Sequence, residues 1–206
     1  MDAPRAAAAM VVVRAAAGAE TGGIEVLVAR RSTRSRFAPG YVVFPGGALD
    51  PGDDGLALAW FGEPARPSLS CALRELVEEV GLSVAGCSVV EAPERRPRVE
   101  PPLPDLAAFH EMARWVAPEF LPVRFDARFF AVVAGPGLRP SPDGVEIDDA
   151  WWARPGDVVR RSVEGSVSLA WPTLCMLEAL TACRTVDEAL DLRVSQVPPP
   201  LERSAP

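Results

Sequence analysis

The sequence has almost no histidine and no lysine. His110 is its single histidine, and all 21 basic residues are arginine. One histidine cannot build a histidine-based zinc site, and it argues against a catalytic triad that depends on histidine. If the chain is an enzyme, carboxylate side chains are therefore expected to transfer its protons and to bind its metal ions.

Paired cysteines and membrane-spanning runs are also missing. The four cysteines, Cys71, Cys87, Cys175 and Cys183, show no CxxC spacing, so free thiols in a reducing cytoplasm are expected. No apolar run approaches the roughly 18 residues of a membrane span. The Ala-rich start does not predict export, because its apolar stretch is short, Arg14 interrupts it, and a first β-strand explains it equally well. The sequence therefore predicts a cytoplasmic protein.

The balance of charges limits the kinds of partner. The formal net charge of -7 argues against bulk binding to nucleic acid or to anionic membranes, although a local basic patch could still hold phosphate groups. With 206 residues, of which 49% are hydrophobic and 24% charged, the chain has the composition of one globular domain with its own core.

Apolar periodicity and turn residues predict interspersed strands and helices. Two β-branched runs, Met10–Arg14 and Ile24–Ala29, flank a glycine-containing turn and are expected to form a hairpin. Further strands are expected at Leu82–Glu91, Ala127–Val133 and Glu146–Ala153, and helices at Leu106–Val116, from Pro155, at Leu174–Ala182 and at Val186–Leu192. Asp50–Pro67 is rich in turn residues, and Ala92–Asp105 is expected to form a surface excursion. This order indicates a layered α/β domain.

One predicted helix carries the most informative pattern. Ser68 is a candidate N-cap, and Gly81 is expected to end the helix after Val80. The residues expected to form its buried stripe are Leu69, Leu73, Leu76 and Val80.

Three glutamates lie on another face of this helix. Glu75, Glu78 and Glu79 are spaced i, i+3 and i+4, so their carboxylates are neighbours. Such a face is ordinarily a solvated acidic surface. Three carboxylates repel one another, however, and Arg74 cannot neutralise them all, whereas Mg²⁺ accepts a few carboxylate oxygens together with water and phosphate oxygens.

The same residues resemble a known sequence motif. Arg74–Leu82 matches every specified position of REUxEExGU, the second half of the Nudix box, where U is apolar. Phe44-Pro45-Gly46-Gly47 resembles the loop that opens this box. The chain is therefore similar to Nudix hydrolases. The resemblance implies an α/β fold with a mixed β-sheet sandwiched between helices, and hydrolysis of a diphosphate bond in a nucleoside-diphosphate derivative.

The resemblance also implies roles for particular residues. Glu75, Glu78 and Glu79 would bind Mg²⁺ or Mn²⁺, and Arg74 would orient their carboxylates. Gly46 and Gly47 would contact the substrate. The general base stays open between a box glutamate and a loop acid such as Glu146.

The box is longer here than in the usual pattern. Asp53 stands where the family has a glutamate that pairs with the box arginine, and Arg74 comes 13 residues later than the pattern places it. Glu63 is a second candidate for that acid. The extra segment, Asp54–Pro67, is expected to loop out beside the active site, and its apolar cluster Leu56–Phe61 should either pack on the domain or line an acyl site.

A basic cluster before the box indicates the substrate. Arg31, Ser32, Arg36, Gly40 and Phe44 fall in register with a pattern of Nudix enzymes that act on coenzyme A. The enlarged box and the segments Arg124–Phe130 and Trp171-Pro172-Thr173 resemble acyl-coenzyme A diphosphatases of the long-box type. Arg31 and Arg36 would bind substrate phosphates, because guanidinium groups suit several anionic oxygens at once. A solvated basic turn is the simpler alternative.

Other interpretations remain open at this stage. The substrate could instead be ADP-ribose, a nucleotide sugar or a dinucleotide, or the chain could be a Nudix-fold sensor that binds a nucleotide without cutting it. One domain over residues 1–196 is expected, with a Pro-rich flexible tail at 197–206. The sequence leaves a homodimer open.

Overall fold

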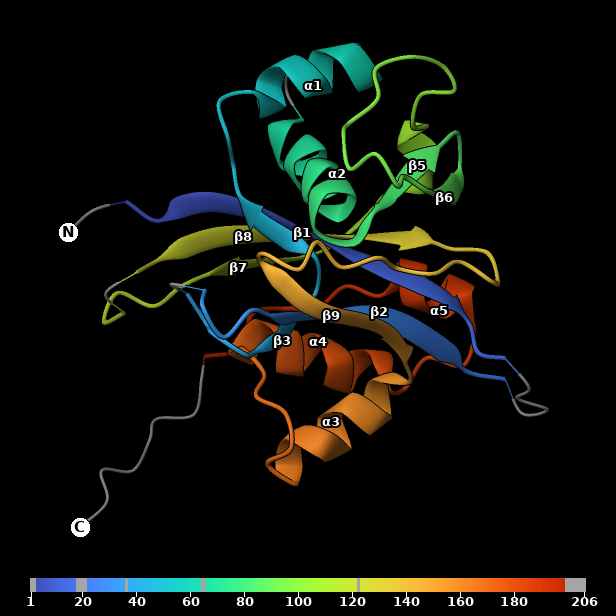
Figure 1. The fold of residues 1–206 in the computed structure, drawn as a ribbon. Coiled ribbons are helices and arrows are strands. Elements are labelled where there is room, and N and C mark those ends of the chain that lie inside the picture. Colours follow the sequence, from blue (N-terminus) through green and yellow to red (C-terminus); the bar gives the residue numbers. More distant parts are fainter. Residues whose placement is uncertain (1–2, 18–21, 36, 64–65, 122, 199–206) are drawn as a thin grey trace.

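A central β-sheet organises the molecule, as the computed structural model in Figure 1 shows. The structure describes residues 3–17, 22–35, 37–63, 66–121 and 123–198. The strands are β1 (Arg5–Ala15), β2 (Ile24–Arg31), β3 (Val42–Val43), β4 (Gly46–Ala48), β5 (Leu82–Ala85), β6 (Ser88–Glu91), β7 (His110–Val116), β8 (Phe125–Val133) and β9 (Ile147–Ala153). The helices are α1 (Asp53–Phe61), α2 (Pro67–Val80), α3 (Pro155–Val163), α4 (Trp171–Leu180) and α5 (Val186–Asp191), with a 3-10 turn at Leu106–Ala108.

The main sheet is mixed, as expected. Its order is β3-β2-β1-β8-β7, with β4 also paired to β1 and β9 also paired to β2. The pair β1–β8 is parallel, and the other pairs are antiparallel. Strand β1 lies at the centre because Met10–Val13 are fully buried and can face apolar layers on both sides. The predicted hairpin of β1 and β2 is confirmed.

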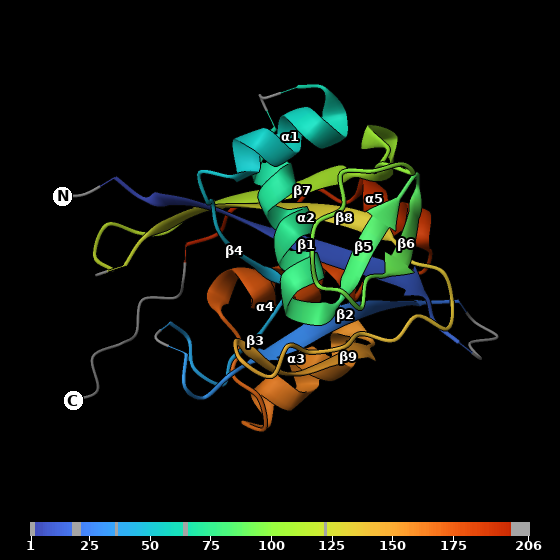
Figure 2. The same ribbon diagram turned by 45° about the horizontal axis from the view of Figure 1, so that its top comes forward.

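Helices cover both faces of this sheet, so the sandwiched α/β arrangement is confirmed. Helices α1 and α2 lie over one face, and α3 and α4 lie over the other (Figures 1 and 2). Two separate apolar clusters follow from this arrangement. Met10 and Leu27 point into the cluster beneath α2, whereas Val11 and Val26 point into the cluster that includes α4.

The glutamate helix forms for the reasons that the sequence indicates. All four residues of its predicted stripe are buried, and Gly81 ends it in the left-handed conformation at φ +64°. The predicted cap at Ser68 is wrong. Arg66 is the N-cap residue, and Pro67 starts the helix because its ring presets the helical φ and its missing N–H would have no partner there.

Three other predictions of secondary structure are corrected. Leu106–Val116 is not a helix, since only a 3-10 turn precedes strand β7, which pairs with β8. Leu82–Glu91 is not one strand but the hairpin β5–β6. Asp50–Pro67 is not made of turns alone, because Asp53–Phe61 forms helix α1, whose Ala57 and Trp60 are buried. Its apolar cluster packs on the domain.

Two further observations concern the lengths of the helices and the state of the cysteines. No helix in the described ranges is long and apolar enough to cross a membrane. The four cysteines are free thiols, and Cys71 is buried. Residues 199–206 of the predicted tail lie outside the described part of the chain.

Candidate active site

The loop that contains the two glycines of FPGG lies directly against the glutamate helix. The N–H of Gly46 donates to Glu79 Oε2 at 2.9 Å, and the Cys71 thiol donates to the carbonyl of Gly47 at 3.5 Å. A Cβ on Gly47 would overlap the Glu75 carboxylate, and a Cβ on Gly46 would overlap the backbone of Ala8. Both close approaches arise because β4 is packed between β1 and α2, and at Gly46 the obstacle is backbone, whereas at Gly47 it is the end of a side chain.

Arg74 lies at the centre of a network of charges. Its Nε donates to Asp53 Oδ1 at 2.8 Å, and its Nη1 donates to Glu75 Oε1 and to Glu78 Oε2, each at 2.9 Å. A further bond joins Nη2 to the carbonyl of Ala48 at 3.3 Å. The guanidinium therefore fixes the start of α1, the loop and the acidic face of α2 relative to one another.

The structure decides which acid pairs with the box arginine. Asp53 is fully buried and binds Arg74 with both carboxylate oxygens, at 2.8 and 3.2 Å. Glu63 instead pairs with Arg66 in an exposed contact at 3.1 Å. Asp53 thus supplies the counter-charge although its side chain is one methylene shorter than glutamate.

Glu79 differs from its neighbours because it is buried without full hydrogen bonding. Its side chain is 3% exposed, whereas that of Glu78 is 44% exposed. Among the described residues, no hydrogen-bond partner is found for Glu79 Oε1, which lies 3.8 Å from Arg31 Nη1. Burial, reinforced by the negative charge of Glu75, raises the pKa of Glu79 well above its usual range. Burial likewise raises the pKa of Glu75.

These carboxylates fit a divalent cation in their chemistry. A buried oxygen without a partner is costly unless a positive charge compensates it, and Glu79 offers such an oxygen beside Glu75. Within the described ranges, no three histidine, cysteine or acidic side chains already form a metal-binding group. Glu75 and Glu78 are instead directed toward Arg74. A bound cation would therefore share these two carboxylates with the arginine.

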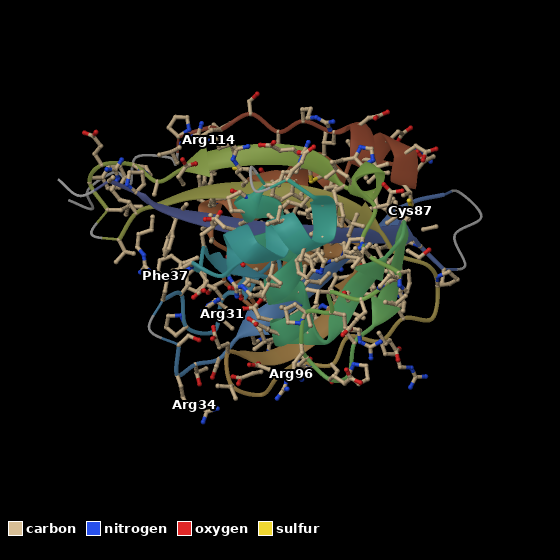
Figure 3. The ribbon with its side chains drawn as sticks, turned by 90° about the horizontal axis from the view of Figure 1, so that it is seen from above. Arg31, Arg34, Phe37, Cys87, Arg96 and Arg114 are labelled. Carbon is tan, nitrogen blue, oxygen red and sulfur yellow. The ribbon has the colours of Figure 1, made fainter. Side chains whose placement is uncertain are left out.

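Arg31 is the basic residue that the fold brings to this cluster. It ends strand β2, and its Nε donates to the carbonyl of Phe37 at 3.1 Å. Its Nη1 lies near Glu79, and its Nη2 lies 3.9 Å from Glu146 Oε2. Pairing of β2 with β9 brings Glu146 here, because Ser32 N–H donates to the Glu146 carbonyl at 2.7 Å. Figure 3 shows Arg31 in the body of the molecule and Arg34 extending away.

The other residues of the basic pattern have different surroundings. Ser32 and Phe44 are buried, and Gly40 has φ +75°, a conformation that favours glycine. These three residues serve the turn and the core, so their register alone does not identify a phosphate site. Arg36 lies outside the described residues, and Arg31 alone of the two predicted phosphate-binding arginines can be placed.

One residue at this site has no signal in the sequence. Arg95, in the Pro-rich excursion, donates from Nη1 to the carbonyl of Glu78 at 3.0 Å. Nothing in the local pattern distinguishes it from Arg96 and Arg98, because the contact joins segments that are far apart in the chain.

Comparison with known proteins agrees with this geometry. The NUDIX domain family model matches residues 4–167. The chain is similar to a solved Nudix hydrolase from Alicyclobacillus acidocaldarius, at TM-score 0.79 and 33% identity over 95% of this chain and 100% of that one. The comparison with curated proteins gave no match.

Two more distant structures share the fold. The Nudix domain of Shewanella oneidensis NrtR, solved with ADP ribose, has a TM-score of 0.55 and 14% identity over 86% of each chain. A MutT protein from Methanosarcina mazei Go1 has a TM-score of 0.54 and 15% identity over 87% of this chain and 95% of its own. With the family match over most of its length, the chain belongs to the Nudix hydrolase family, whose members act on diphosphate bonds of nucleoside-diphosphate derivatives.

Proposed function

We propose that the chain is a metal-dependent diphosphatase that hydrolyses coenzyme A or acyl-coenzyme A. The position of Arg31 is the main support for phosphate binding by this site. Its Nη1 lies 3.8 Å from Glu79, and its Nη2 lies 3.9 Å from Glu146. A guanidinium that lies near one buried and one exposed carboxylate can hold the diphosphate of a substrate beside the cation that neutralises it.

Glu75, Glu78 and Glu79 are the residues proposed to hold Mg²⁺ or Mn²⁺. When bound, such an ion neutralises diphosphate charge and acidifies water. Arg74 orients two of these carboxylates through its Nη1. Gly46 and Gly47 let the loop approach α2, and a contact of either glycine with the substrate stays a prediction.

Glu146 is the proposed general base. It precedes β9, its side chain is 64% exposed, and it faces Arg31. Glu79 is buried and Glu78 is paired with Arg74, so neither is as accessible to water. In the reaction, the water oxygen bonds to phosphorus, its proton passes to Glu146, and the bridging P–O bond of the diphosphate breaks.

Support for coenzyme A comes from the basic pattern and from an apolar neighbour of Arg31. Phe37, whose carbonyl binds Arg31, has a 49% exposed side chain and packs edge-on against Phe125 with ring centroids 5.2 Å apart. Figure 3 shows Phe37 on the same side as Arg31. An apolar ring beside a phosphate-binding arginine suits a ligand that joins a diphosphate to a pantetheine or acyl chain.

A panel of diphosphates tests this proposal. Coenzyme A, acetyl-coenzyme A, ADP-ribose, a nucleotide sugar and a dinucleotide are each incubated with the protein and Mg²⁺, and products are separated by liquid chromatography with mass detection. Coenzyme A should give 4′-phosphopantetheine and adenosine 3′,5′-bisphosphate. Efficient cleavage of ADP-ribose or a nucleotide sugar without cleavage of coenzyme A would reject the coenzyme A assignment. It would leave the diphosphatase intact.

A further inference from the structure

The last turn of the glutamate helix is bound to a loop that follows β8. The carbonyl of Glu79 accepts from the N–H of Asp143 at 3.0 Å, and the carbonyl of Val80 accepts from the N–H of Ser141 at 2.8 Å. Backbone carbonyls at a helix C-terminus otherwise lack partners within the helix. The loop therefore supplies backbone caps to the helix that carries the acidic cluster.

Arg95 joins the same two segments through its side chain. Its Nη1 donates to the carbonyl of Glu78 at 3.0 Å. Its Nη2 donates to the Ser141 carbonyl, to Ser141 Oγ at 3.0 Å and to the Pro142 carbonyl at 2.8 Å. One planar guanidinium thus bridges the helix and the loop, and a positive charge at a helix C-terminus also suits the helix dipole.

Hydrogen bonds within the loop also hold the backbone of Glu146 in place. The carboxylate of Asp143 accepts the backbone N–H groups of Val145, Glu146 and Ile147 at 3.1, 3.1 and 2.8 Å. The N–H of Gly144 closes the turn on the Ile147 carbonyl at 3.0 Å. Few rotations remain between Ser141, which Arg95 holds, and the backbone of Glu146.

The backbone of Arg95 is itself held in an uncommon conformation. Its φ is +53°, in the left-handed region that residues with a Cβ rarely adopt. Its N–H donates to the Ala92 carbonyl at 3.0 Å, and the Ala92 N–H donates to the Gly81 carbonyl at 2.7 Å. Such a conformation persists where the surroundings determine it. Arg96, the next residue, is exposed and extends away from the body of the protein (Figure 3).

We infer that Arg95 is a positioning residue for the hydrolysis reaction, because its guanidinium fixes the loop of residues 141–147 on the glutamate helix and thereby sets where Glu146 lies. The inference rests on the proposed role of Glu146 as the base. Within the described residues, Arg95 binds the helix at the Glu78 carbonyl and the loop at Ser141 and Pro142, and no hydrogen bond joins it to the side chain of Glu146 or of a box glutamate. Its effect on the base would therefore pass through the loop. Its loss should lower turnover while leaving the cation-binding carboxylates in place.

A double-mutant cycle between Arg95 and Glu146 tests the inference. Arg95→Ala, Glu146→Gln and the double variant are compared with the unaltered protein for kcat and KM, on whichever diphosphate is cleaved best. Arg95→Ala should lower kcat about tenfold or more, with KM changed less than threefold. In the Glu146→Gln background the same change should have almost no effect on kcat, because two distant residues couple only through a shared element.

Further variants separate positioning from charge and from folding. Arg95→Lys keeps the positive charge but lacks the planar guanidinium that binds the helix and the loop at once. Its kcat should therefore be as low as that of Arg95→Ala. Arg96→Ala is the matched control and should leave kcat unchanged. Mn²⁺ dissociation constants should agree within about twofold across the set. Should Arg95→Ala fail to fold, Ser141→Ala removes one acceptor and should lower kcat in the same direction, again only when Glu146 is present.

The outcomes distinguish this inference from the proposal beneath it. Additive effects of Arg95→Ala and Glu146→Gln, or a wild-type kcat for Arg95→Lys, would overturn the positioning role while leaving Glu146 as the base. A wild-type kcat for Glu146→Gln would overturn the base assignment, and the role of Arg95 with it. A loss of Mn²⁺ affinity in Arg95→Ala would show that Arg95 positions the cation-binding glutamates of the helix, and would overturn its proposed action through the loop.

Discussion

The three box glutamates occupy different environments although they share one helical face. Glu78 is 44% exposed and pairs with Arg74, whereas Glu79 is 3% exposed and has an oxygen for which the described part of the chain offers no hydrogen-bond partner. Residue spacing predicted the shared face but not this difference in burial. Burial depends on the loop of Gly46 and on β2, which close over Glu79 from other parts of the chain.

Glu79→Gln should separate cation binding from folding. The amide keeps an acceptor for the Gly46 N–H but removes the charge, so turnover with Mg²⁺ should fall about 100-fold or more. Because the buried carboxylate lacks a partner for Oε1, its removal should not destabilise the metal-free protein. Urea unfolding with and without Mg²⁺ measures both effects: the unaltered protein gains stability from the ion, and the variant does not. Hydrolysis at the wild-type rate would show that Glu79 binds no catalytic metal.

Asp53 illustrates a choice that spacing left open. The sequence offered Asp53 and Glu63 as the acid that pairs with Arg74, since Asp53 directly precedes the extra segment and Glu63 lies inside it. Only the folded arrangement buries one of them against the guanidinium. That contact depends on where helix α1 begins, which the turn-rich sequence of residues 50–53 did not reveal.

Asp53→Asn should therefore be strongly destabilising. It removes one charge of a buried pair and leaves Arg74 only partly compensated, which typically costs about 3–5 kcal/mol. The free energy of unfolding from urea titration checks this value. Glu63→Gln is the control, since its exposed pair with Arg66 should contribute within about 0.5 kcal/mol. Equal effects of the two substitutions would contradict the assignment of Asp53.

At the scale of secondary-structure elements, the sequence predicted the glutamate helix well and strand β7 wrongly. The helix has a local signal, because its apolar stripe and its terminal glycine lie within one short stretch. His110–Val116 contains Glu, Met, Ala and Arg, which favour helices, yet it pairs with β8 along its length. Pairing with a distant strand overrides the local helix propensity, and no pattern within the segment predicts which strand it pairs with.

Strand β4 gives a prediction about two adjacent glycines. Gly46→Ala would place a methyl group on the backbone of Ala8 in β1, which cannot move, so the free energy of unfolding should drop by about 1–3 kcal/mol. Gly47→Ala would meet the end of the Glu75 side chain, which can rotate away. The second variant should stay folded but lose most of its activity, because Glu75 leaves its place beside Arg74. Thermal unfolding and turnover, measured on both variants, should thus rank them in opposite orders.

At the scale of the whole molecule, the site is assembled from four distant segments. The end of β2, the loop into β4, helix α2 and the turn before β9 meet above one face of the sheet (Figures 1 and 2). The sequence indicated three of them separately, through the basic pattern, FPGG and the glutamates, and the fourth only through Glu146 as an example of a loop acid. Their meeting depends on the pairing of β2 with β9 and of β1 with β4, which are long-range contacts and leave no local signature.

The position of Arg31 in this assembly suggests a test that separates the two predicted phosphate-binding arginines. Arg31 faces Glu79 and Glu146, so its contact should be with the diphosphate that every substrate shares. Arg31→Ala should then lower kcat/KM for coenzyme A and for 3′-dephospho-coenzyme A by the same factor. Arg36, assigned by sequence register alone, remains the candidate for the 3′-phosphate. A charge-assisted bond there is worth about 1.5–3 kcal/mol, or roughly a tenfold to hundredfold preference for coenzyme A over the dephospho form. Arg36→Ala should remove that preference and leave hydrolysis of the dephospho compound unchanged.

Paired kinetics on the two compounds decide between these roles. Arg34→Ala is the control, because Arg34 lies in the same loop and is directed away from the body of the protein. Within the described residues, its guanidinium donates to the Gly144 carbonyl at 3.3 Å. If the preference for coenzyme A over the dephospho form persists in Arg36→Ala and disappears in Arg31→Ala, Arg31 binds the 3′-phosphate and Arg36 does not. If the unaltered protein cleaves coenzyme A and 3′-dephospho-coenzyme A equally well, the protein does not recognise the 3′-phosphate. The net charge of -7 sharpens this test, since a protein that repels polyanions overall must rely on such local cations to select one.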